Sequence, residues 1–123
     1  MPATVATLNP SGGRPTVEII IGNAQRGTYE FSLFDSNGAN RTVFATGRTD
    51  TVPDIFQIPG ATVPAMANTT IMWRAVIESF TGAADNFAVT VRVIQDGQVR
   101  GSEEKTGLTT DTPPEGFIRL QMG

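Results

Sequence analysis

The chain has 123 residues, with nine Lys and Arg residues against twelve Asp and Glu residues and a formal net charge of −3. It contains no His and no Cys, which excludes disulfide bonds, His- or Cys-liganded zinc and copper sites, and Ser-His-Asp or Cys-His catalytic groups. The acidic balance and the scattered Arg residues also argue against a nucleic-acid-binding protein, which needs clustered positive charge.

The length predicts one domain spanning residues 1–123, large enough to bury a core without disulfides or metal. No apolar run is long enough for a membrane-spanning helix, so none is expected. The first five residues carry neither a basic stretch nor a long apolar stretch, which predicts no secretion signal there. The absence of Cys fits both reducing and oxidising compartments, so the composition does not assign a location.

Apolar and polar residues alternate with a period of two along most of the chain, the pattern of half-buried strands. Asp96-Gly97 and Asn37-Gly38 are turn signals that predict two β-hairpins. The only segment that suits a short helical turn is 61–68, which contains Pro64. The clearest strands are expected at 17–21, 29–33, 71–78, 87–93 and 118–122, and shorter or less regular ones at 4–8, 41–46, 54–58 and 99–105.

About eight short strands separated by Gly- and Pro-rich turns predict an all-β fold. We expect an antiparallel β-sandwich of the jelly-roll or immunoglobulin-like type, with a closed β-barrel as the alternative. The period of two also assigns faces: Trp73 and Tyr29 fall on the apolar register and are expected in the core. The outward register carries charged residues, namely Glu18, Glu30, Arg74, Glu78, Arg92 and Arg119.

Several apolar residues fall on the outward register, more than a sandwich with one solvated face per sheet needs. An exposed apolar patch usually marks an interface, so either a loop or another subunit is expected to cover these side chains. The candidate interface residues are Ile20, Phe34, Met72, Val76, Ile94 and Phe117.

A second set of residues suggests ligand binding. The Asp35–Asn40 segment offers oxygen ligands in a turn, but Ala39 and Thr46 occupy positions where an EF-hand loop needs ligands. Asp, Asn and Gly loops also bind sugars in small acidic lectins, in some cases through calcium. The candidate ligand-binding residues are Asp35, Asn37, Asn40, Asp85 and Asn86, with no metal ligand assigned and calcium as the only candidate cofactor.

An enzyme of this composition would have to use carboxylates, Arg, Tyr29 or Lys105. A carboxylate pair is the first arrangement to weigh, because glycoside hydrolysis needs only two acids. One Trp and one Tyr provide few aromatic platforms for the extended cleft of a small glycosidase. We therefore expect no enzymatic activity and name no catalytic residue. The acids that a hydrolase would draw on are Glu18, Glu30, Glu78 and Asp85.

The sequence therefore favours a binding or assembly module over an enzyme, with partners that are copies of itself or another protein. The alternative is a lectin-like carbohydrate-binding module that uses the Asp and Asn loops, with or without calcium. A carboxylate-dependent glycoside hydrolase is the third interpretation. The sequence does not identify a specific ligand or partner.

Overall fold

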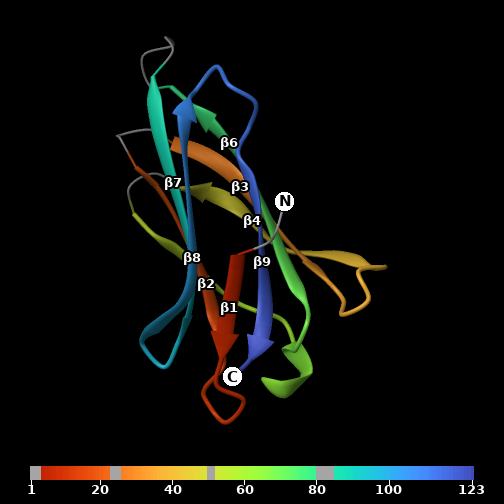
Figure 1. Ribbon diagram of the computed structural model, residues 1–123. Coiled ribbons are helices and arrows are strands. Elements are labelled where there is room, and N and C mark those ends of the chain that lie inside the picture. The colour runs from red at the N-terminus through yellow and green to blue at the C-terminus, as the bar shows by residue number, and fades with distance from the viewer. Residues whose placement is uncertain (1–3, 23–25, 50–51, 80–84) are drawn as a thin grey trace.

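The computed structural model describes residues 4–22, 26–49, 52–79 and 85–123. These residues form nine strands in two sheets, which lie as two layers in Figure 1, and one short 3-10 helix. The five-stranded sheet has the order β1 (Thr4–Leu8), β9 (Glu115–Met122), β6 (Thr70–Glu78), β3 (Arg26–Phe34), β4 (Arg41–Thr49). The four-stranded sheet has the order β5 (Asp54–Gln57), β2 (Thr16–Gly22), β7 (Asn86–Gln95), β8 (Gln98–Leu108), and the helix is η1 (Pro64–Met66).

The predicted β-sandwich is confirmed. Among the described residues no backbone ladder joins one sheet to the other, so the alternative of a closed barrel is wrong. The pairing is antiparallel except at one pair, because β1 lies parallel to β9. Parallel neighbours need a long connection, and nearly the whole chain separates these two strands.

The predicted local elements are also found. The Asp96-Gly97 turn joins β7 to β8, and the Asn37-Gly38 turn joins β3 to β4. The helical turn expected within 61–68 is η1, with Pro64 at its first position, where a missing backbone N–H costs nothing. Within the described part of the chain, no helix has the length and apolarity needed to cross a membrane.

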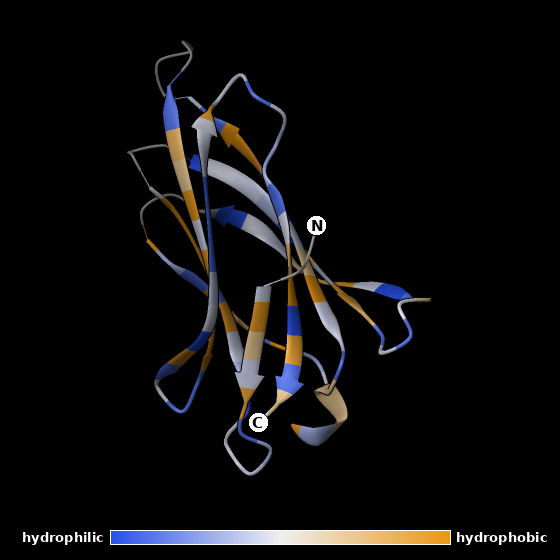
Figure 2. Ribbon diagram, in the orientation of Figure 1, coloured by the Kyte–Doolittle hydropathy of each residue, from blue (hydrophilic) through white to orange (hydrophobic). Residues whose placement is uncertain are grey.

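The core lies between the two sheets and is built from the alternating registers of their strands. Figure 2 shows hydrophobic and hydrophilic residues alternating along the strands. Trp73 and Phe31 are fully buried and Tyr29 is nearly so, as the register predicted. Further fully buried core side chains come from both sheets, including Val17, Ile19, Ile21, Ile71, Val89, Val91, Val93, Ile118 and Leu120.

The charged residues predicted for the outward register do point outward, but one of them is not exposed to solvent as expected. Glu18 points outward from β2 but is only 8% exposed. It lies on an inner strand, where Ile55 and Arg92 are its direct neighbours on either side. Side chains on flanking strands cover such a central position, which an alternation pattern alone does not reveal.

A carboxylate links the two sheets at one edge of the sandwich. Glu103 projects from β8 between the layers, where Oε1 accepts a 2.8 Å hydrogen bond from the indole N–H of Trp73. Its Oε2 accepts a 2.8 Å hydrogen bond from the Thr4 hydroxyl of β1. The sequence placed Glu103 in a loosely patterned, charged strand, so its inward direction is a finding of the structure. We call this the Glu103 contact.

A second carboxylate links the sheets at the opposite edge. The Tyr29 hydroxyl of β3 donates a 2.7 Å hydrogen bond to Asp54 of β5. We call this the Asp54 contact. At each edge contact a glycine leaves room for the aromatic donor: a Cβ at Gly116 would lie 2.6 Å from Trp73 Nε1, and one at Gly47 would lie 2.8 Å from Tyr29 Cζ.

The Asp54 contact predicts a specific response to alkaline pH. Burial, followed by the hydrogen bond and charge of Asp54, raises the pKa of Tyr29 well above its ordinary value near 10. Because the folded-state pKa exceeds the unfolded one, this stabilisation is complete below pH 10 and is lost as pH rises beyond it. Tyr29 is the sole Tyr, so ultraviolet phenolate absorbance follows it directly.

In the wild-type protein we expect phenolate absorbance to appear only well above pH 10, together with loss of the fold. In Tyr29→Phe the slope of the free energy of unfolding against pH in that range should disappear. Circular dichroism on the same samples reports the fold. Reversible phenolate formation near pH 10 in the intact protein would show that the Asp54 contact does not hold the phenol.

Candidate functional site

The outer face of the five-stranded sheet carries a row of mainly apolar side chains across four strands. Strand register places Phe117 opposite Met72, Met72 opposite Ser32, and Ser32 opposite Val43. Phe117 is 40% exposed and Val43 is 48% exposed. We call these four residues the apolar row; it runs perpendicular to β9, β6, β3 and β4 and spans about 14 Å at the usual strand spacing.

Two rows that are charged and polar except for Phe34 flank the apolar row, about 7 Å away on either side. Both are defined by the same strand register, and both contain Arg side chains. The Arg119 row is Arg119, Thr70, Phe34 and Arg41; the Glu115 row is Glu115, Arg74, Glu30 and Thr46.

A hollow of about 370 Å³ opens on the Glu115 side of the apolar row. Met72 and Val76 of β6 form part of its lining, and polar side chains complete it. Arg41 extends along the hollow, where its guanidinium donates to the Ser32 hydroxyl at 3.0 Å and forms an ion pair with Glu30. The other lining residues are Thr28, Tyr29, Thr46 and Arg74.

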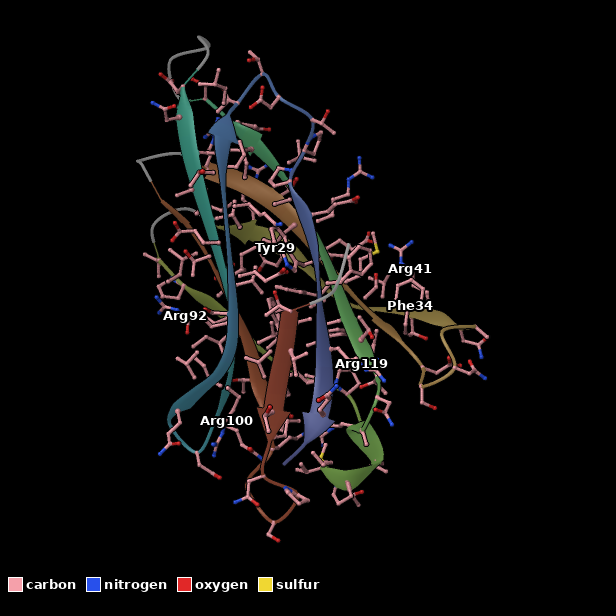
Figure 3. All side chains as sticks on the ribbon, viewed as in Figure 1. Tyr29, Phe34, Arg41, Arg92, Arg100 and Arg119 are labelled. Carbon is pink, nitrogen blue, oxygen red and sulfur yellow. The ribbon has the colours of Figure 1, made fainter. Side chains whose placement is uncertain are left out.

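The arginines fall on two sides of the molecule. Figure 3 shows Phe34, Arg41 and Arg119 on the side formed by the five-stranded sheet, away from Arg92 and Arg100 on the other layer. Arg92 comes from β7 and Arg100 from β8. The outer face of the five-stranded sheet therefore combines exposed apolar side chains with both signs of charge.

A smaller pocket of about 270 Å³ lies beside the β3–β4 hairpin. Its apolar lining includes Phe44, the additional residue of a β-bulge, because Ala45 pairs with Phe31 and Val43 pairs with Ser32. We call it the hairpin pocket. Its lining residues are Leu33, Asp35, Asn40, Thr42, Phe44, Pro59 and Thr69.

Asp35 at the rim of the hairpin pocket organises the turn. Its Oδ2 accepts a 2.7 Å hydrogen bond from the side-chain amide of Asn40, and its Oδ1 accepts a 3.0 Å hydrogen bond from the backbone N–H of Ala39. The hydrogen bond from Asn40 is the largest cause that lowers the pKa of Asp35 below its ordinary value. Both carboxylate oxygens are thus engaged within the hairpin.

The structure divides the predicted ligand-binding residues between two ends of the molecule. Asp35, Asn37 and Asn40 lie together in the β3–β4 turn, which follows Phe34. Asn86 begins β7 in the other sheet, and Asp85 just before it accepts a hydrogen bond from Ser79 just after β6, at the opposite end of the five-stranded sheet. The antiparallel β3–β6 register separates the two groups by about 27 Å, so the structure does not bring them together.

The predicted interface residues are divided as well. Phe34, Met72, Val76 and Phe117 lie on the outer face of the five-stranded sheet, whereas Ile20 and Ile94 are half-buried on the outer face of the four-stranded sheet. The prediction missed Val43, whose alternation is interrupted by the bulge at Phe44. The sequence also did not show that Glu115 and Arg119 lie beside these apolar side chains, because their neighbours on the face depend on the strand order.

The acids that a hydrolase would use do not form a cleft in the described chain. Glu30 is ion-paired with Arg41 and Glu78 with Arg26, both on the outer face of the five-stranded sheet. Glu18 lies on the outer face of the other sheet and Asp85 beyond the end of β6. No three Asp or Glu side chains of the described ranges lie close enough together to hold a metal ion.

Comparison with protein-family models, curated proteins and solved structures gives no match to this chain.

Proposed function

We propose that this chain is a non-catalytic assembly module, a structural or interaction subunit that associates with itself. The observation that carries the proposal is the apolar row, which leaves Phe117 of β9 and Val43 of β4 exposed on the outer face of the five-stranded sheet. Val76, beyond the Glu115 row on β6, adds a third side chain at 47% exposure. Apolar side chains gathered on one face and rimmed by charge are typical of protein interfaces.

The rest of the molecule supports a scaffold. The aromatic side chains Trp73 and Tyr29 are committed to the edge contacts between the sheets. Glu30 and Glu78 are engaged in ion pairs on the same outer face. A rigid sandwich with exposed apolar side chains on the outer face of a sheet suits association better than substrate turnover.

We expect light scattering across the micromolar range to report a mass above that of one chain, rising with concentration. Val43→Glu should shift the molecule to the monomer, because it places a charge in the apolar row. Val99→Glu is the matched control, since Val99 is 55% exposed on the outer face of the other sheet. A strict monomer at every concentration would contradict the proposal.

The hairpin pocket supports a second candidate function, a lectin-like module that binds a small carbohydrate. The observation in its favour is that Asp35 and Asn40 line the pocket together with the aromatic ring of Phe44. Sugar sites combine hydrogen-bonding groups with an apolar surface, and this pocket has both, although its volume suits only one small ring.

Carbohydrate binding would appear as backbone amide shifts at the hairpin pocket in a nuclear magnetic resonance titration with a monosaccharide panel. Asn40→Ala should weaken those shifts and Ser36→Ala should not, because Ser36 lies in the same turn outside the pocket lining. The panel is measured with calcium and with a chelator. If the amides of the hairpin pocket do not shift in either series, the lectin candidate is wrong.

A further inference from the structure

The outer face of β9 carries opposite charges on either side of an aromatic ring. Glu115, Phe117 and Arg119 alternate along this face, and all three are exposed. Each charge therefore lies about 7 Å from the phenylalanine along the strand. A second β9 laid antiparallel across the first would meet Phe117 with Phe117, Glu115 with Arg119, and Arg119 with Glu115.

We propose that two copies of this chain pack through their five-stranded sheets about a two-fold axis that runs along the apolar row. The inference rests on the proposed self-association and names its surface and symmetry. A half-turn about the apolar row places each residue of that row against the same residue of the partner copy. It also places the Arg119 row of each copy against the Glu115 row of the other. Arg119 then faces Glu115 of the partner copy, an Arg–carboxylate pair that forms twice in the dimer.

The hollow gives the same arrangement a steric reason. Phe34 and Glu30 lie on β3 on opposite sides of the apolar row, separated by Ser32. The half-turn therefore brings Phe34 of each copy over Glu30 of the other copy. Glu30 is one of the residues that line the hollow. The hollow also contains Arg41 and Arg74, and guanidinium groups bind aromatic faces favourably. The axis that pairs the charges thus also places the Phe34 ring of one copy at the hollow of the other.

The size of the face matches a stable dimer. Five strands of up to nine residues give a sheet face of about 700 Å² per copy, near the usual interface of about 800 Å² per partner. Two such faces pack about 10 Å apart, as the layers of a sandwich do. The area, the charges and the shape therefore agree on a second copy as the occupant.

Pairing along strand edges is a poorer route to the same dimer. β4, which contributes Val43 to the apolar row, is an edge strand, and its bulge at Phe44 interrupts the ladder. Arg41 and Arg48 stand on either side of that bulge. Bulges and charged side chains are the features that protect sheet edges from pairing. The surface of this sheet that is available for association is therefore its outer face and not its edge.

Single cysteines test the position of the axis, because the chain has no cysteine of its own. Val43 lies on the proposed axis, whereas Val76 lies about 13 Å from it on the same face, so the two Val76 positions would be about 27 Å apart. Their exposed fractions are matched at 48% and 47%. A short bismaleimide should join Val43→Cys chains into covalent dimers and leave Val76→Cys chains unjoined.

Charge exchange tests the pairing. Glu115→Arg or Arg119→Glu alone should raise the dissociation constant about tenfold, because each change places like charges together at two symmetric positions. The double variant Glu115→Arg with Arg119→Glu should return it to within about threefold of the wild type. Glu104→Arg, on the outer face of the other sheet, is the charge-matched control and should leave it unchanged. Circular dichroism confirms that each variant is folded.

The outcomes separate the two proposals. A wild-type chain that stays monomeric overturns the self-association and this arrangement with it. Two results would overturn the two-fold arrangement while leaving self-association intact. One is that Val76→Cys crosslinks as well as Val43→Cys. The other is that the double variant binds itself no more tightly than the single variants. Preferential crosslinking through Val43 and recovery in the double variant together support it.

Discussion

The fold depends on two partly buried carboxylate contacts that join the sheets at their edges. Glu103 accepts hydrogen bonds from Trp73 and Thr4 on one side, and Asp54 accepts one from Tyr29 on the other. A sandwich core is held by apolar burial, which has no direction, whereas these hydrogen bonds fix which residues of the two layers face each other. An indole or phenol buried without its acceptor would cost free energy, so each contact favours one relative position of the sheets.

That positional constraint links the interior to the outer face. Two of the strands that donate to the edge contacts, β3 and β6, are neighbouring inner strands of the five-stranded sheet. Their register places Met72 beside Ser32 and so builds the middle of the apolar row. With the inward residues committed to the core and to the edge contacts, the outward residues are free to form an interface. Packing and proposed assembly thus use alternate residues of the same strands.

Alternation in the sequence predicted the strands, the buried Trp73 and the outward direction of Phe117, because these depend on local pattern. It could not predict which outward residues become neighbours, because strand order is set by contacts far apart in the chain. The sequence therefore offered the Asp35 and Asp85 loops as candidates without showing that they lie at opposite ends of a sheet. Glu103 was missed for a different reason: its strand has charged neighbours, and only the facing Trp73 explains a carboxylate directed inward.

The most direct test of this account is the free energy of unfolding of two Glu103 variants, followed by Trp73 fluorescence. Glu103→Ala leaves the buried indole N–H of Trp73 without its acceptor and should cost about 1–3 kcal/mol. Glu103→Gln keeps an acceptor oxygen and should lose less, while Glu104→Ala, an exposed neighbour, should change little. If Glu103→Ala is as stable as the wild type, the edge contacts do not hold the sheets in place and the central claim is wrong.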